Sequence, residues 1–219
     1  MIRSGLVLLA LAVALVTPAA RALSAAEPTR EEALAALADT RNVDNRRHGA
    51  MALAKTGVMA DVPKLAAALR DDDPLVRKLA ERSMWEVWSR SGDAAVDRLL
   101  ASGIEQMSAR EGELAVQTFT EVIRRRPDFA EGWNKRATVY YLMGEYQKSL
   151  ADCDEVMKRN PYHFGALSGY ALIYIRLEYY DRALEYSRRA LEVNPNMDGV
   201  RRNIDLLERL LEQRRVRMI

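Results

Sequence analysis

The stretch WNKRATVYYLMGEYQKSLADCDEVMKRNP, residues 133–161, decides the fold of this chain. It reads as two helical segments, and it ends at Pro161, where the helix must stop because proline has no backbone N–H. Pro127 and Pro195 lie 34 residues before and after Pro161, and each follows a similar helical pattern. A 34-residue period predicts a helix–turn–helix unit that repeats along the chain as a solenoid.

The residues inside this period resemble the tetratricopeptide repeat. In the central unit the signature positions of that family hold Trp133, Ala137, Tyr140, Gly144, Tyr146 and Pro161. The next unit offers Leu167, Ala171, Tyr174, Tyr180, Ala183, Ala190 and Pro195. The unit before departs from the pattern at its turn, where Arg110 stands at the usual glycine. The resemblance implies three units within residues 93–197, at about 96–129, 130–163 and 164–197.

The C-terminal segment, residues 198–219, is predicted to be a capping helix and tail. One stripe of this helix is apolar: Val200, Ile204, Leu207 and Leu211. Its opposite face is charged: Arg201, Asp205, Glu208, Arg209, Glu212 and Arg215. A solenoid needs such a polar outer face on its last helix, because no further repeat covers it.

The N-terminal half, residues 27–92, resembles a pair of short HEAT-like repeats. Two stretches rich in small residues, 45–57 and 76–87, echo each other, and Asp73 precedes the second as an N-cap, with Pro74 at the first helical position. Thr29 and Glu32 have the spacing of a capping box, which predicts an additional helix over 29–39.

Two such units cannot bury their faces alone, so we expect them to stack directly on the helix that starts near Asp93. The short polar turn 89–92 then makes one continuous solenoid. Trp85 and Trp88 share a helix face at this junction, as interface core or, alternatively, as an exposed aromatic patch. The predicted fold class is all-α: a right-handed α-solenoid with a HEAT-like pair, three tetratricopeptide units and a capping helix.

Residues 1–26 have the pattern of a secretory signal peptide. Arg3 precedes the uncharged stretch 5–16, which is too short to span a bilayer, and Pro18 ends it. Small residues allow cleavage after Ala22 or after Ala26, and an uncleaved anchor or a buried helix is the alternative. We expect an exported protein, periplasmic in a Gram-negative source and otherwise secreted, with no stable membrane insertion after cleavage.

Composition disfavours several classes of function. The 219 residues contain 33 Lys and Arg against 31 Asp and Glu, and loss of Arg3 and Arg21 with the signal leaves no net charge, so we expect no nucleic-acid partner. One cysteine and two histidines make a metal site improbable. We find no phosphate-binding loop or nucleophile elbow, and therefore predict no cofactor and no catalytic residue. Cys153 has an interior phase and is expected to be buried and inert.

The tetratricopeptide resemblance implies a concave groove that binds a protein or peptide partner. The residues that it places on this groove are Leu100, Ile104, Met107, Glu131, Asn134, Thr138, Tyr141, Ser168, Leu172, Ile175, Arg202 and Leu206. Seven of these are large and apolar or aromatic, which suits an amphipathic helix or an extended apolar peptide, and Asn134 can pair with a peptide backbone. Alternatively, the N-terminal half folds across the groove, or these residues are ordinary solenoid packing.

The best-known peptide mode of the family clamps a C-terminal carboxylate with basic and Asn side chains. Leu100, Ile104, Gly165 and Gly169 stand where that mode needs Lys, Asn, Lys and Arg, so this clamp is absent. The two glycines indicate a close approach to the backbone, by a neighbouring helix or by a ligand. We predict a non-enzymatic interaction scaffold of an envelope complex. A lyase-type or accessory enzyme subunit, by resemblance to some HEAT-like proteins, and a self-associating structural subunit are the alternatives.

Overall fold

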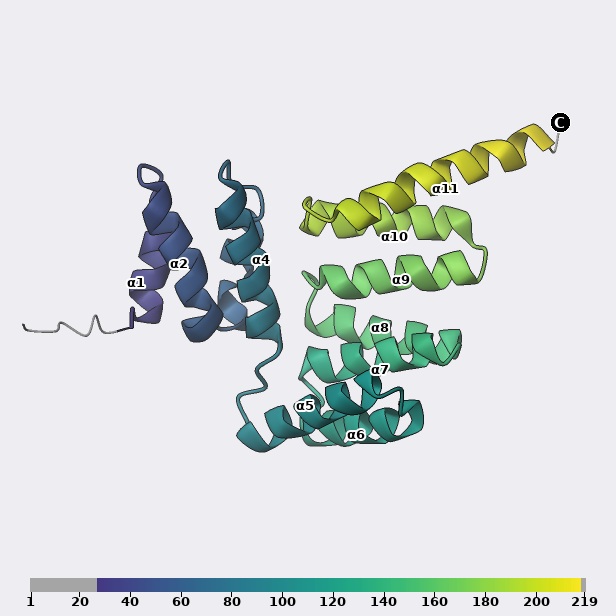
Figure 1. The fold of residues 1–219 in the computed structure, drawn as a ribbon, viewed down its shortest axis with the longest axis horizontal. Helices are drawn as coiled ribbons and strands as arrows, with labels where there is room; N and C mark the ends of the chain where they lie inside the picture. Colours follow the sequence, from purple (N-terminus) through teal and green to yellow (C-terminus); the bar gives the residue numbers. More distant parts are fainter. Residues whose placement is uncertain (1–26, 218–219) are drawn as a thin grey trace, which may run out of the picture.

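The computed structural model describes residues 27–217, and every regular element in this range is helical (Figure 1). The N-terminal module, residues 27–90, contains α1 (Arg30–Leu37), α2 (Val43–Thr56), the short 3₁₀ helix η1 (Met59–Asp61), α3 (Val62–Ala68) and α4 (Pro74–Trp88). The solenoid contains α5 (Ala94–Ser108), α6 (Gly112–Arg125), α7 (Ala130–Leu142), α8 (Tyr146–Arg159), α9 (Phe164–Arg176), α10 (Tyr180–Val193) and α11 (Asp198–Arg217). The predicted helical repeat solenoid is confirmed, and the predicted signal peptide lies outside the described residues.

The helix starts of the N-terminal module follow from their sequence. Thr29 accepts the Glu32 N–H, and the Glu32 carboxylate accepts from the Thr29 N–H, so the predicted capping box forms. Asp73 caps α4 by accepting the Val76 N–H, with Pro74 at the first helical position as predicted. These local signals fix where the chain enters each helix.

The solenoid is built from antiparallel helix pairs in which α5, α7 and α9 are the first helices and α6, α8 and α10 the second. α7, α9 and α11 begin at residues 130, 164 and 198, where the sequence placed the starts of the second and third units and of the cap. The turns inside the pairs share a left-handed residue at one phase: Arg110 at φ 63°, Gly144 at φ 79° and Glu178 at φ 61°. The family's usual glycine at this phase is explained by the positive φ, which glycine adopts without steric cost. Two of the three units nevertheless have a non-glycine residue there.

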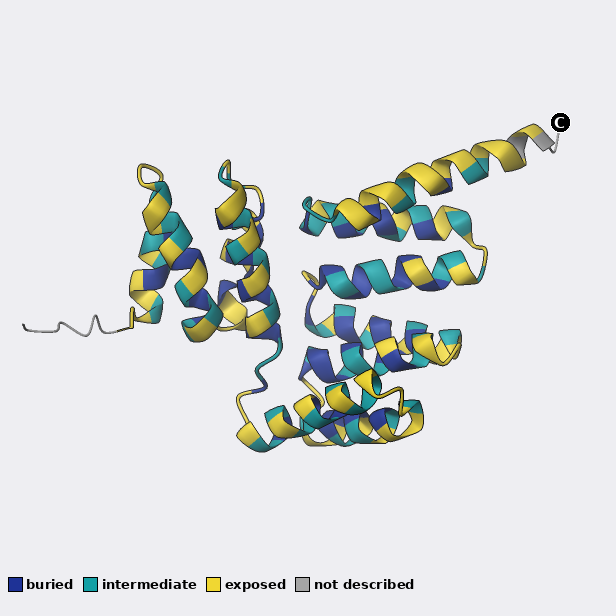
Figure 2. Ribbon diagram, in the orientation of Figure 1, coloured by how far each residue is buried: buried dark blue, intermediate teal, exposed yellow. Residues whose placement is uncertain are grey.

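The capping helix α11 covers the last pair with the predicted stripe. Val200 and Leu207 are buried, and Ile204 packs against the same cluster. Its outward face is exposed along most of its length (Figure 2). Within residues 27–217 no helix combines the length and the apolarity that crossing a membrane requires.

The N-terminal module does not stack on α5, so this part of the expected arrangement is wrong. Its core, formed by α1–α4, takes in Phe164 at the start of α9 together with Val193 and Met197 beside the α10–α11 loop. The module thus packs against the loops that join successive repeats, across the edge of the solenoid. Two polar contacts hold this seam: Asn196 donates to the Leu69 carbonyl at 2.8 Å, and Arg70 donates to the main-chain oxygens of residues 192 and 193.

Trp85 and Trp88 are interface core, as one of the two interpretations predicted, but their partner is α9. Trp88 is 3% exposed, and its ring stacks on the His163 ring with 4.5 Å between centroids. The Trp85 ring meets Phe164 edge-on at 5.2 Å. The junction differs from the expected one because the apolar residues that pack on this core, among them Phe164 and Met197, lie where successive repeats are joined.

Candidate functional site

A cavity of about 150 Å³ opens between α7 and α9, with α8 beneath it. It is lined by five of the residues that the sequence assigned to the groove: Asn134, Thr138, Tyr141, Ser168 and Leu172. Thr138 and Leu172 are exposed at its rim, and Asn134 is 9% exposed. The structure therefore brings together the central part of the predicted groove.

The remaining predicted groove residues divide into three groups. Ile104, Met107 and Ile175 are half-buried, and the first two pack against the α5–α6 core. Arg202 and Leu206 are exposed on α11. Leu100 and Glu131 are buried, at 3% and 1% exposure, so their assignment to an open groove is corrected.

The two buried residues have different physical reasons for their position. Leu100 belongs to the apolar cluster of Phe119, Phe129 and Val139, because α5 packs closely on α6 and α7. Glu131 instead accepts a hydrogen bond from His163 and contacts Lys135. Neither side chain can reach a partner in the groove.

Glu131 organises a buried polar network below the groove. His163 Nε2 lies 3.0 Å from Glu131 Oε2, and the same oxygen accepts from Asn134 Nδ2 at 3.1 Å. The Lys135 ammonium lies 3.0 Å from Glu131 Oε1. Burial alone would raise the pKa of Glu131, but the His163 hydrogen bond and the Lys135 charge outweigh it and hold this pKa below its ordinary value.

His163 links this network to the N-terminal module. Its Nδ1 accepts the Ala166 N–H at 3.0 Å as the N-cap of α9, so the ring proton lies on Nε2 and points to Glu131. The ring is fully buried and lies against Trp88. The sequence alone gives no obvious partner for His163. Its signal was the repeat phase: the residues 34 positions before and after are Phe129 and Met197, so the ring stands at an apolar position.

The two glycines of α9 serve different purposes. A Cβ at Gly165 would lie 2.6 Å from Trp85 Cη2, so the close approach of the N-terminal module requires glycine there. A Cβ at Gly169 would lie 3.7 Å from Cys153 Sγ, an ordinary contact. Gly169 therefore leaves room that the neighbouring helices do not need, and that room belongs to the cavity.

The thiol of Cys153 is shielded from solvent. Cys153 is 2% exposed, and burial raises the pKa of its thiol to about 12, which keeps it protonated as expected. No group of three His, Cys, Asp or Glu residues within 27–217 has the geometry to hold a metal ion. His48 is exposed on α2, far in sequence from His163 in the seam.

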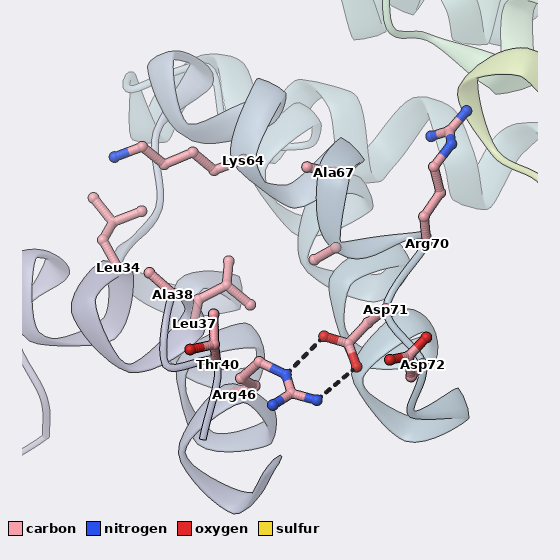
Figure 3. A pocket seen from close by; sticks show the side chains of 11 residues that line it. Leu34, Leu37, Ala38, Thr40, Arg46, Lys64, Ala67, Arg70, Asp71 and Asp72 are labelled. Carbon is pink, nitrogen blue, oxygen red and sulfur yellow. Dashed lines mark hydrogen bonds and ion pairs between the residues drawn. The ribbon is translucent and has the colours of Figure 1, made fainter. Parts of the chain in front are cut away.

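A wider hollow of about 590 Å³ lies in the N-terminal module, between the C-terminal ends of α1 and α3 (Figure 3). Leu34, Leu37 and Ala67 form part of its apolar wall, and charged side chains surround it. Arg46 and Asp71 form a bidentate pair across it, with contacts of 2.7 and 3.0 Å. The charges of Arg46 and Asp71 therefore satisfy each other and are not free for a ligand.

Comparison with known proteins identifies the repeats. The family model of the tetratricopeptide repeat matches residues 165–197. Residues 165–197 therefore carry a tetratricopeptide repeat. A TPR repeat-containing protein from Rhizobium etli is 40% identical over 86 residues, which is 39% of this chain and 42% of the relative. The alignment with this chain thus covers less than half the length of that relative.

Solved tetratricopeptide structures share the fold of the solenoid. The Sgt2 TPR domain of Aspergillus fumigatus superposes with a TM-score of 0.54 at 22% identity, over 56% of this chain and 83% of that domain. The TPR2B domain of yeast Sti1, in its complex with pHsp70, superposes with a TM-score of 0.50 at 26% identity, over 56% of this chain and 99% of that domain. The HEAT-like character of the N-terminal module remains a resemblance.

Proposed function

We propose that this protein is a non-enzymatic interaction scaffold that binds an extended peptide segment of a partner protein in the concave tetratricopeptide groove. The observation that carries the proposal is the α7–α9 cavity, which joins apolar walls with the amide of Asn134. A few convergent polar groups in an apolar concavity are typical of binding sites. The similarity to the Sti1 domain in its complex with pHsp70 supports a protein or peptide as the ligand.

The mode of binding is expected to differ from the carboxylate clamp. Leu100 is buried, and Gly165 is covered by Trp85, so neither position can present a cation to a peptide carboxylate. Recognition would instead use the apolar wall and the peptide backbone. A carboxamide offers both a donor and an acceptor to that backbone.

The compartment and the assembly are part of the same proposal. The signal-peptide pattern of residues 1–26 supports export, to the periplasm in a Gram-negative source, and a place in an envelope complex. N-terminal sequencing of the protein recovered from its native compartment tests this, since cleavage after Ala22 or Ala26 is expected. An intact N-terminus in the cytosolic fraction would overturn export without affecting the groove.

A photo-crosslinking residue at Thr138 tests the groove itself. Thr138 is exposed at the rim of the cavity, so we expect covalent adducts with a partner peptide, identified by mass spectrometry. The double variant Asn134→Ala, Tyr141→Ala should abolish these adducts. A matched control is Gln117→Ala, Tyr179→Ala, which removes an exposed amide and an exposed phenol outside the cavity. Equal partner recovery from both double variants would contradict the proposal.

The same preparation separates the two other candidate functions. Adducts that join two copies of this chain through Thr138 would favour a self-associating subunit, and light scattering would then show a concentration-dependent mass. An enzyme subunit would require reacting side chains in the cavity, whereas its one thiol, Cys153, is held protonated by burial.

A further inference from the structure

We propose that the cavity between α7 and α9 is a socket for one apolar side chain of leucine or phenylalanine size, on an extended peptide with acidic residues beside the anchor. This inference rests on the proposed function of the groove. It adds the chemistry of the partner, which the fold alone does not specify.

The size of the cavity sets the size of the anchor. At about 150 Å³ it matches the volume of an engineered apolar cavity that admits benzene. Its walls are formed largely by aliphatic groups, among them Ala137, Ala166, Leu172 and Ile173. A leucine or a phenyl side chain fits such a space, whereas an alanine would leave most of it unfilled.

Gly169 contributes space to the cavity. A Cβ added at Gly169 would meet no atom closer than Cys153 Sγ at 3.7 Å. The packing of the neighbouring helices therefore does not require a glycine at this position. Glycine in a helix interior costs about 1 kcal/mol relative to alanine. Gly165, in contrast, is fully explained by Trp85 at 2.6 Å. Of the two glycines that line the cavity, Gly165 and Gly169, only Gly169 lacks a packing reason.

The Asn134 amide at the cavity is available to a peptide backbone. Asn134 is more than nine-tenths buried and lines the cavity, and its Nδ2 donates to Glu131. Its Oδ1 accepts no hydrogen bond from the side chains and backbone of residues 27–217 and remains accessible to solvent, so it is free to accept one from a ligand. The backbone N–H of the anchoring residue would donate that hydrogen bond.

The charges around the cavity favour acidic neighbours of the anchor. The single acidic residue of α7, Glu131, is buried and paired with Lys135, and α9 contains none. Arg176 at the end of α9 is exposed, and its Nε contacts the Tyr141 hydroxyl at 3.2 Å. The Arg176 guanidinium beside Tyr141 would attract a carboxylate of the peptide and disfavour a basic one.

Acetylated and amidated pentapeptides test the socket. The probes are EELEE, EEAEE and KKLKK, whose blocked ends remove the C-terminal carboxylate. By NMR titration of the full chain we expect EELEE to saturate in the millimolar range or below and to shift the Ala137 and Ala166 methyl signals. EEAEE should bind at least tenfold more weakly, because most of the apolar burial is lost. KKLKK should bind more weakly as well.

Substitution at Gly169 provides the second arm. Gly169→Leu fills the socket and should reduce EELEE binding to the level of EEAEE, while Gly169→Ala should reduce it in part. The control is Gly199→Leu on α11, where the nearest atom is the Arg202 side chain at 3.9 Å, and it should leave binding unchanged. If Gly169→Leu fails to fold, the EELEE to EEAEE ratio and Gly169→Ala still decide.

The two proposals can fail separately. Equal affinity for EELEE and EEAEE, or unchanged EELEE binding by folded Gly169→Leu, would overturn the socket. If Thr138 still crosslinks to a partner under those results, the scaffold proposal stands without it. Equal recovery of the partner from both double variants would instead remove the groove from partner binding.

Discussion

The N-terminal module and the solenoid are both helical, but different interactions hold them together. In the module, bidentate arginine–carboxylate pairs connect elements far apart in sequence: Arg30 with Asp61, Arg46 with Asp71 and Arg47 with Asp73. In the solenoid, neighbouring helices meet mainly through small and aromatic residues at repeated phases. The solenoid also has a bidentate pair between helices, Arg136 with Asp152, but its small and aromatic contacts recur in each repeat, whereas the contacts of the module do not.

The contrast extends to how closely the helices approach. In the module a Cβ at Gly49 would lie 2.3 Å from the Leu37 nitrogen, so α1 and α2 meet backbone to backbone. In the solenoid a Cβ at Gly103 would meet the Phe119 ring at 2.5 Å, which is a side chain filling the space of a missing one. Both regions use glycine for packing. In the solenoid the glycines Gly103 and Gly132 each face an apolar side chain of the neighbouring helix, whereas Gly49 in the module faces backbone atoms.

The largest effect is expected where the two regions meet. Trp88→Ala removes the ring that stacks on His163, and we expect the free energy of unfolding to fall by about 3–5 kcal/mol. Urea denaturation monitored by circular dichroism measures it. Trp133→Ala, in the solenoid and half-buried, is the matched control and should cost less. A loss below about 1 kcal/mol for Trp88→Ala would mean that the seam contributes little.

Acid should destabilise the N-terminal module. Hydrogen bonds from Arg30 hold the pKa of Asp61 below its ordinary value, and Arg47 holds that of Asp73 at about 2. A depressed pKa stabilises the fold fully above the unfolded value of 3.8, and this stability is lost as the pH falls towards the folded value. Unfolding followed between pH 6 and pH 2, with Trp85 and Trp88 as module fluorophores, should therefore show a steep loss below about pH 4.

The variant Asp61→Asn sharpens this test. It removes the carboxylate charge to which Arg30 donates two hydrogen bonds. The free energy of unfolding should fall by about 1–3 kcal/mol at neutral pH. Its pH profile should be flatter than that of the wild type, because one acid-sensitive group is already gone. The exposed Asp72→Asn is the control. Parallel profiles for wild type and Asp61→Asn would contradict the assignment.

The smallest effects are expected at the solenoid turns. Arg110→Gly and Glu178→Gly each relieve a left-handed residue and should raise the free energy of unfolding by up to about 1 kcal/mol. Gly144→Ala should lower it by a similar amount, because alanine would have to adopt the same positive φ. Ser108→Gly, within α5, is the control and should be destabilising. Thermal unfolding detects shifts of this size.

Much of the solenoid was predictable because its signals repeat. Three prolines at one phase fix the helix ends, and Thr29 and Asp73 mark helix starts by local hydrogen bonds that need no tertiary context. The central groove residues followed from the same phase, which is why Asn134, Thr138 and Leu172 meet at one cavity. Periodicity carries such information directly from sequence to position.

The seam could not be read in the same way. Its contacts join residues such as Leu69 and Asn196, which belong to different repeat types and share no period. Glu131 was assigned to the groove because its phase is right, yet the N-terminal module buries His163 against it and withdraws it from the surface. Contacts between regions far apart in sequence thus decide the burial of Glu131, and the repeat phase alone does not contain that information.

The seam also determines how early in translation the N-terminal module can finish folding. Arg70 and Asn196 make contacts across 123 and 127 residues, and non-local contacts of this kind form late in folding. The N-terminal module leaves the ribosome first, but the residues that cover its tryptophans, up to Met197, are translated near the end. A nascent chain stalled before the third repeat would display those indole rings to chaperones, and its release would coincide with their disappearance from solvent.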